Sequence, residues 1–171
     1  MNNLGDGKVI ANDLQYVELD DQTFEKFRLN AGDILFNRTN SFDLVGKVGL
    51  FNLDAPFVFA SYLIRVVVDR DKVNPEYVNR YLDWGECQAR LKMLASRGVS
   101  QSNINATKLR GFRIPLPLRS EQQEITDVLS AVDHKIAMLQ DRKSAQEQLF
   151  KTLLNDLMTA RIRVKRLEVE A

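Results

Sequence analysis

The feature that most constrains this chain is a run of apolar side chains near its C-terminus that repeats every three or four residues. Twelve positions follow one another at this spacing without a slip, and ten of them are apolar. A heptad pattern sustained in this way predicts one long helix, from about residue 121 to 165, with an apolar stripe that packs on another helix. The stripe consists of Ile125, Leu129, Val132, Ile136, Leu139, Lys143, Gln146, Phe150, Leu153, Leu157, Ala160 and Val164.

The length of this helix favours a partner outside the chain. At 1.5 Å per residue it would extend roughly 65 Å, whereas a domain of ~115 residues has a radius of gyration on the order of 13 Å. An ordinary core-facing helix would explain a shorter stripe. We therefore expect intermolecular pairing, most simply with a second copy of the chain.

Two polar positions in the stripe predict the direction of pairing. In a parallel dimer Lys143 would face Lys143 of the other chain and bury two like charges together. In an antiparallel pair centred between residues 144 and 145, Lys143 meets Gln146, and every apolar position meets an apolar one. The amide oxygen of Gln146 can accept a hydrogen bond from the ammonium group, so we favour the antiparallel homodimer.

The residues before the stripe predict a strand-rich α+β domain. Runs at 33–36, 45–51 and 57–68 are rich in β-branched and aromatic residues and are bounded by turn residues. Asn74, Pro75 and Glu76 predict the start of a helix over about 75–96, with a weak point at Gly85. Ser120 and Gln123 predict a capping box for the long helix. We expect a globular recognition domain at 1–118, a coiled-coil helix at 119–166 and a tail at 167–171.

Composition excludes several classes of protein. The chain has 171 residues, of which 44% are hydrophobic and 27% charged, and it contains no apolar window long enough to cross a bilayer. With one cysteine and one histidine it lacks an intrachain disulfide and a zinc site of Cys and His, and a solvated His134 would leave Ser-His-Asp or Cys-His catalysis without its base. Cys87 is expected to be small and partly buried, and His134 to be solvated. We expect a cytoplasmic protein without catalytic residues or metal ligands.

Charge is distributed unevenly although the net charge is only +1. Residues 1–60 carry five basic and nine acidic side chains, while residues 61–118 carry ten basic and five acidic ones. Within residues 90–113 there are six basic side chains and no acidic one. An anionic partner should therefore meet the second half of the domain.

Two polar segments, at residues 37–41 and 97–105, are rich in the side-chain types that contact nucleic-acid bases and phosphates. Arginine can bind guanine, Asn and Gln can bind adenine, and Lys and Arg bind phosphates. The alternative is a pair of solvated turns held by their own Asx and Ser hydrogen bonds. We predict phosphate contacts for Lys47, Arg97, Lys108 and Arg110. Contacts with bases or groove walls are predicted for Asn37, Arg38, Asn40, Gln101, Asn103 and Asn105.

An ordered set of five motifs resembles the specificity subunits of type I restriction-modification systems. The motifs are Gly32-Asp33-Ile34-Leu35-Phe36-Asn37-Arg38, Val45-Gly46-Lys47, Ser100-Gln101-Ser102-Asn103-Ile104-Asn105, Ile114-Pro115-Leu116-Pro117 with Glu121-Gln122, and Leu153-Leu154-Asn155-Asp156-Leu157-Met158-Thr159. The resemblance implies a non-catalytic subunit in which two recognition regions, each followed by a long helix, grip two parts of a split DNA sequence. Methylating and cleaving subunits would dock on it.

The chain departs from that pattern in having one recognition region and one helix, and we expect its N-terminus to fall inside the recognition region. Ala160 also stands where the family commonly has glycine. Two copies paired through their helices would restore the whole. Our hypothesis is a DNA-binding specificity subunit without a cofactor of its own, whose methyltransferase partner uses S-adenosylmethionine. The alternative is a coiled-coil interaction module that does not bind DNA.

Overall fold

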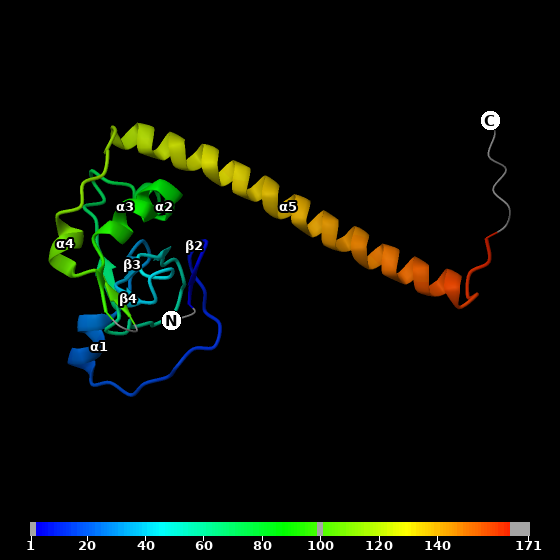
Figure 1. The fold of residues 1–171 in the computed structure, drawn as a ribbon, viewed down its shortest axis with the longest axis horizontal. Helices are drawn as coiled ribbons and strands as arrows, with labels where there is room; N and C mark the ends of the chain where they lie inside the picture. Colours follow the sequence, from blue (N-terminus) through cyan, green and yellow to red (C-terminus); the bar gives the residue numbers. More distant parts are fainter. Residues whose placement is uncertain (1–2, 99–100, 165–171) are drawn as a thin grey trace. The chain divides into compact units, whose positions relative to one another are not determined.

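The computed structural model describes residues 3–98 and 101–164, and Figure 1 labels many of its elements along the chain. The chain divides into two units, Met1–Thr126 and Asp127–Ala171. Val99, Ser100 and the expected tail at 167–171 lie outside the described residues. Mixed sheets and a long C-terminal helix confirm the α+β class. The strands are β1 (Leu4–Gly5), β2 (Gly7–Val9), β3 (Ile34–Asn37), β4 (Thr39–Asn40), β5 (Val48–Leu50), β6 (Leu63–Val66), β7 (Ser96–Arg97) and β8 (Ser102–Asn103). The helices are α1 (Asp21–Phe27), α2 (Pro75–Asp83), α3 (Gly85–Met93), α4 (Ala106–Arg110) and α5 (Arg119–Met158).

The main sheet has five strands in the order β1-β2-β5-β3-β6, and only the β2–β5 pair is parallel. The predicted run at 33–36 becomes β3, in which every residue is buried. In β3, Phe36 lies opposite Val48 of β5 and Ile64 of β6. A continuous apolar strand of this kind is typical of a sheet covered on both faces.

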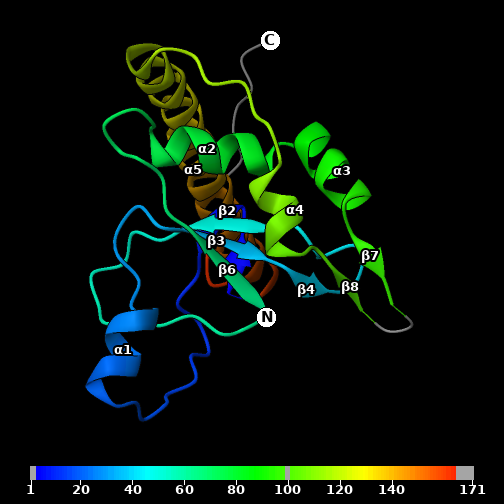
Figure 2. The same ribbon diagram turned by 90° about the vertical axis from the view of Figure 1, so that its left-hand side faces the viewer.

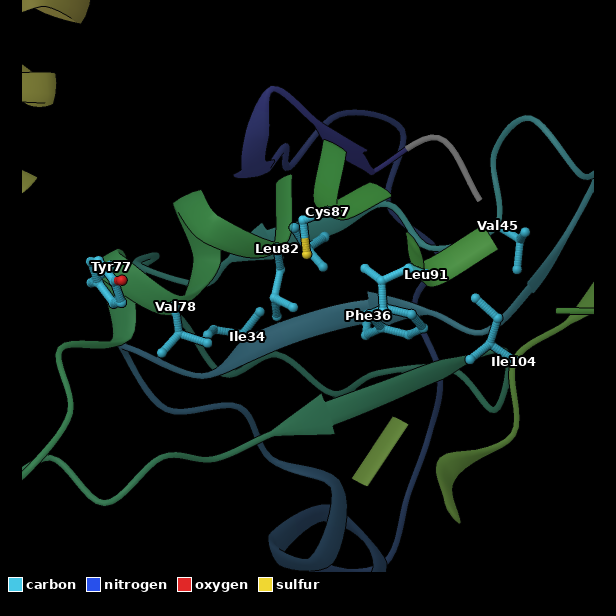
Figure 3. Close-up of a cluster of buried hydrophobic side chains, with 10 residues drawn as sticks. Ile34, Phe36, Val45, Tyr77, Val78, Leu82, Cys87, Leu91 and Ile104 are labelled. Atoms are coloured by element: carbon cyan, nitrogen blue, oxygen red, sulfur yellow. The ribbon is translucent and has the colours of Figure 1, made fainter. Parts of the chain in front are cut away.

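Each face of this sheet has its own apolar cluster. Ile34 and Phe36 pack against side chains of α2 and α3, namely Leu82, Cys87 and Leu91 (Figure 3). Figure 2 shows the two helices beside the sheet. On the other face β3 contributes Leu35, whose cluster contains Leu4, Leu29 and Phe51. Cys87 is therefore fully buried, not partly buried as predicted, because its side chain points from α3 into the larger cluster.

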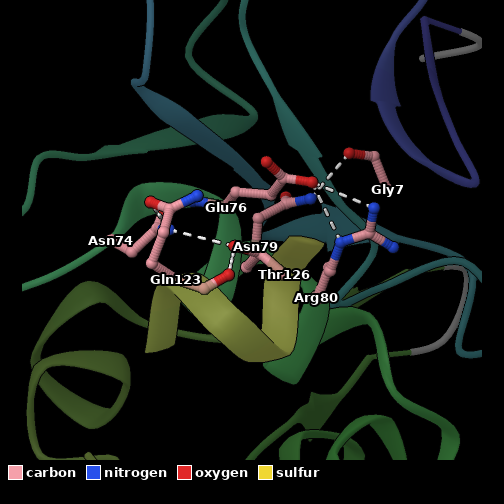
Figure 4. Close-up of polar contacts among 7 residues, drawn as sticks. All are labelled: Gly7, Asn74, Glu76, Asn79, Arg80, Gln123 and Thr126. Atoms are coloured by element: carbon pink, nitrogen blue, oxygen red, sulfur yellow. Dashed lines mark hydrogen bonds and ion pairs between the residues drawn. The ribbon is translucent and has the colours of Figure 1, made fainter. Parts of the chain in front are cut away.

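A tight turn joins β1 and β2, and the sequence analysis missed it. Asp6 and Gly7 form the turn, with φ of 51° and 68°. Two successive positive φ values are typical of the type I′ hairpin, for which Asp-Gly is a common sequence. The carbonyl of Gly7 accepts a hydrogen bond of 2.7 Å from Asn79 Nδ2 of α2, which Figure 4 shows.

The predicted helix over 75–96 is two helices. Its start is confirmed, because the Asn74 side chain accepts from the backbone N–H of Glu76 at 2.9 Å. Trp84 then adopts an extended backbone, with φ −60° and ψ 135°, and ends α2 before Gly85 begins α3. Gln88 Nε2 donates to the Leu82 carbonyl at 2.6 Å, so an acceptor freed by the break is satisfied.

Helix α5 begins at Arg119, so the predicted capping box at Ser120 is wrong. Ser120 already lies inside the helix, and the Gln123 side chain accepts from Asn74 Nδ2 at 3.1 Å instead (Figure 4). Gln122 is fully buried, and its Nε2 donates to the Pro117 carbonyl at 2.8 Å. These two amides fix the first turns of α5 to the start of α2.

Helix α5 ends at Met158, earlier than the predicted residue 165. Ala160 has a φ of 56°, a left-handed conformation that stops a helix and suits glycine. The backbone N–H of Arg161 donates back to the Asp156 carbonyl at 2.9 Å, which closes the final turn. The last two predicted stripe positions, Ala160 and Val164, therefore lie beyond the helix.

Candidate nucleic-acid interface

A second, three-stranded sheet joins the two polar segments of the sequence. Its order is β4-β8-β7 and both pairings are antiparallel, as Figure 2 shows. Asn103 lies opposite Thr39 on one side and Ser96 on the other, and its Nδ2 donates to Thr39 Oγ1 at 2.6 Å. Segments some sixty residues apart in the sequence thus form one surface.

The predicted contact residues differ in exposure. Exposed side chains are those of Lys47, Arg97, Gln101, Asn105, Lys108 and Arg110, while Arg38 and Asn103 are half-buried. Asn37 and Asn40 are only 2% and 7% exposed, so neither side chain reaches the surface in this structure. Among the predicted amides, Gln101 and Asn105 are the ones presented to solvent.

Three buried polar atoms lie at the junction of β3 and β4. Within the described residues Asn37 Oδ1, Arg38 Nε and Asn40 Nδ2 have no hydrogen-bond partner. The other amide atom of Asn40, Oδ1, accepts from the backbone N–H of Ser41 at 2.8 Å. An unpaired buried polar atom costs about 1–3 kcal/mol, so this junction is a costly way to join two strands.

Two predicted contact residues support the local fold of α4. The Asn105 side chain caps the helix and accepts from the backbone N–H groups of Thr107 and Lys108 at 2.6 and 3.3 Å. Lys108 Nζ donates to the Leu94 carbonyl at 3.1 Å and to Ser96 Oγ at 3.3 Å. The Lys108 ammonium therefore lies beside the last turn of α3 and beside β7, at the rim of the three-stranded sheet.

An aromatic ring that the sequence analysis missed lies next to the predicted site. The guanidinium carbon of Arg97 lies 4.0 Å from the ring centroid of Phe42, and Lys92 Nζ lies 5.9 Å from the same centroid. Phe42 belongs to the turn after β4 and is half-buried. An aromatic residue one position after the Asn-Arg-Thr-Asn-Ser segment was the available signal.

Two other basic residues contact the domain itself. Arg90 donates to the hydroxyl of Tyr81 and to the carbonyl of Arg113, both at 3.1 Å, and lies 4.8 Å from the Phe112 ring centroid. Lys47 interacts electrostatically with Asp83. The pKa of Asp83 is raised overall by desolvation and by the Asp6 carboxylate, and the positive charge of Lys47 partly offsets that rise. In the described part of the chain the Lys47 side chain makes no hydrogen bond or ion pair with the three-stranded sheet.

The apolar stripe of α5 is exposed from Leu129 to Leu157. The apolar side chains of the stripe between Leu129 and Leu157 are 41% to 65% exposed to solvent. Ile125, at the start of the stripe, instead packs on the larger core cluster. Lys143 forms an ion pair of 3.8 Å with Glu147 on the same helix. The stripe therefore offers apolar surface, and one charge within it is paired along the helix.

Neither a metal centre nor a membrane span is found in the described residues. No cluster of three or more His, Cys, Asp or Glu side chains that could hold a metal ion occurs there, and no helix is long and apolar enough to cross a membrane. His134 lies exposed on α5, as predicted. Burial raises the pKa of the Cys87 thiol, although Arg90 opposes the shift.

Comparisons with known proteins give one consistent result. Residues 2–148 match the family model described as the type I restriction modification DNA specificity domain. The chain is 31% identical, over 91% of its length, to a Methanocaldococcus jannaschii protein named provisionally as the specificity subunit of the type I restriction enzyme MjaX. It is 25% identical to the MjaVIII specificity subunit of the same organism over 98% of its length, and 26% identical to the EcoKI specificity subunit of Escherichia coli K12 over 70%. These alignments cover 37%, 40% and 26% of the three relatives.

A small α+β domain that gathers amide and basic side chains on one sheet, and continues into a long helix, has the architecture of a target-recognition module. The chain belongs to the family of type I restriction modification DNA specificity domains. This confirms the resemblance drawn from its motifs. The chain spans about two fifths of the length of the two Methanocaldococcus relatives.

Proposed function

We propose that this chain binds double-stranded DNA sequence-specifically and acts as the specificity subunit of a type I restriction-modification system. The observation that carries the proposal is the three-stranded sheet, which brings Arg97, Gln101 and Asn103 together from a hairpin beside β4. Amide and guanidinium groups distinguish base edges, whereas basic side chains around them hold phosphates.

The exposed residues divide into two roles. Lys108 of α4 contacts Ser96 of β7 and would bind a phosphate, as would the exposed Arg110 of the same helix. Lys47 adds positive charge elsewhere on the domain. Gln101 is the exposed amide of the hairpin and would contact a base. The buried amides Asn37 and Asn40 would act indirectly, by holding the β3–β4 junction and therefore the sheet.

The helix supports assembly of two such chains as an antiparallel homodimer. Pairing centred between residues 144 and 145 places Val132 opposite Leu157, Ile136 opposite Leu153 and Leu139 opposite Phe150. The paired stretch from 132 to 157 lies wholly within α5 and is about 38 Å long at 1.5 Å per residue. Each large apolar side chain covered in this way contributes roughly 1.5–3 kcal/mol.

Catalysis would belong to other subunits. A methyltransferase subunit that binds S-adenosylmethionine, and a restriction subunit, would dock on the paired chains and be directed to a split DNA site. The chain itself would be non-catalytic and would act in the cytoplasm. The alternative function, a coiled-coil interaction module without DNA binding, predicts weak salt dependence and no preference for DNA.

Two matched variants test the DNA-binding proposal. Lys108→Ala should weaken binding to specific and random duplexes alike and lower the magnitude of the log-log salt slope by about 1. Gln101→Ala should cost roughly 1–3 kcal/mol on the preferred sequence only. If the unmodified protein binds duplex DNA without salt dependence or sequence preference, the interaction-module alternative is favoured.

A further inference from the structure

The stack of Arg97 on Phe42 spans the three-stranded sheet. Arg97 lies in the outer strand β7, and Phe42 lies in the turn two residues after the other outer strand, β4, so the two residues come from opposite sides of β8. Ser102 of β8 is the register partner of both Arg97 and Asn40, and it is buried. The turn that carries Phe42 is closed by the backbone N–H of Val45, which donates to the Ser41 carbonyl at 2.9 Å. The ring is therefore held in a fixed place beside the sheet.

Arg97 differs from the other basic residues around this sheet. Its guanidinium makes no hydrogen bond or ion pair with another residue in the part of the chain described here, whereas Lys108 Nζ is bound to Leu94 and Ser96. Stacking on an aromatic face restrains the guanidinium plane but leaves the N–H groups at its edge available. The guanidinium of Arg97 is thus held against the ring, while its N–H groups remain free to bind a ligand.

We propose that Phe42 positions Arg97 to read a guanine, with two N–H groups of the guanidinium donating to guanine O6 and N7. This inference rests on the proposed DNA-binding function and changes the predicted role of Arg97 from phosphate contact to base readout. A phosphate can bind a cationic side chain in many orientations. A bidentate contact with guanine requires a guanidinium whose plane is fixed. Phe42 is a positioning residue and Arg97 is the residue that contacts the base.

The test compares three variants of the full chain on one DNA sequence. Selection from random duplexes first defines the preferred site of the unmodified protein, and each G·C pair in that site is then replaced by A·T in turn. Phe42→Leu removes the ring, Arg97→Lys retains the charge without the planar fork, and Phe42→Tyr retains the ring as the matched control. Thermal melting checks that each variant is folded, and Arg97→Lys, at an exposed position, keeps the test decisive if Phe42→Leu unfolds.

We expect Phe42→Leu and Arg97→Lys to lose discrimination at one and the same G·C pair. The expected loss is roughly five- to hundredfold, the range of one bidentate base contact, with the salt slope unchanged. Phe42→Tyr should discriminate as the unmodified protein does.

Two outcomes would overturn the inference while leaving DNA recognition intact. One is unchanged discrimination at every pair in both variants. The other is an equal loss on specific and random DNA in both variants, which would make Arg97 a contact that carries no sequence information. A failure of the unmodified protein to select any sequence would overturn the proposed function, and this inference with it.

Discussion

The backbone N–H of Asn74 donates to Oε1 of Gln122 at 2.8 Å, which fixes the residue before α2 to the second turn of α5. Both residues are buried, and the same Gln122 side chain also donates to the carbonyls of Lys72 and Pro117. One glutamine therefore satisfies three backbone groups from two separate segments. Removing it leaves the buried N–H of Asn74 without this partner and frees two less buried carbonyls.

Gln122→Ala should destabilise the domain by about 1–3 kcal/mol, the cost of leaving one buried group, the N–H of Asn74, without a partner. Gln140→Ala, at an exposed position of the same helix, is the matched control and should change stability by less than about 0.5 kcal/mol. Urea unfolding of both variants measures the difference. Equal effects would show that the hydrogen bonds of Gln122 contribute nothing specific.

Ala160→Gly should strengthen the end of α5. The left-handed φ of 56° costs an alanine about 1 kcal/mol, and glycine adopts it without that cost. Amide hydrogen exchange at Arg161, whose N–H closes the last turn, should slow roughly fivefold. Ala137→Gly, within the helix, should have the opposite effect on helix stability. Faster exchange in Ala160→Gly would contradict the left-handed cap.

Asp83 should give the domain a measurable pH dependence. The pKa of Asp83, an exposed residue whose carboxyl is partly desolvated, is raised above its ordinary value of 3.8 in the folded protein by that desolvation, assisted by Asp6 and opposed by Lys47. The stabilising contribution of the protonated carboxyl is therefore complete below pH 3.8 and is lost as the pH rises through the folded pKa.

Asp83→Asn, which stays uncharged, should consequently be more stable than the unmodified protein near pH 7, and the difference should vanish at low pH. Urea unfolding at both pH values measures this difference, with Asp54→Asn at an exposed position as the control. A difference that is the same at both pH values would contradict the raised pKa.

The secondary structure was predicted best where a residue type strongly favours one local conformation. Asn74 before proline predicted a helix start, and the stripe positions between Leu129 and Leu157 predicted a single helix with an exposed apolar face. The end of that helix was missed because a stripe of apolar residues continues past Ala160, whose backbone conformation ends the helix.

The candidate site was harder to predict, because its strands are only two residues long and carry no periodicity. The sequence identified the two polar segments but not their pairing through Asn103 and Thr39. It also treated Asn37 and Asn40 as exposed, although both are buried under the sheet junction. Phe42 was overlooked because an isolated aromatic residue in a turn is ordinary in sequence and acquires a role only beside Arg97.

Leu153→Asp should separate paired helices. In the antiparallel register it places a carboxylate opposite Ile136, where burial of an unpaired charge is strongly unfavourable. Sedimentation at tens of micromolar should show a dimer for the unmodified protein and a monomer for this variant. Gln148→Asp, off the stripe, should remain dimeric. A monomeric unmodified protein would contradict self-pairing.

Selection from random duplex DNA tests most directly whether the three-stranded sheet recognises sequence and whether two chains act together. A symmetric antiparallel dimer predicts two identical half-sites, arranged as an inverted repeat and separated by a fixed gap. The enriched sequences should contain such a repeat, and Gln101→Ala should change the base preference in both halves. A final pool with no sequence enriched over the starting one, at physiological salt, would contradict DNA recognition by this chain.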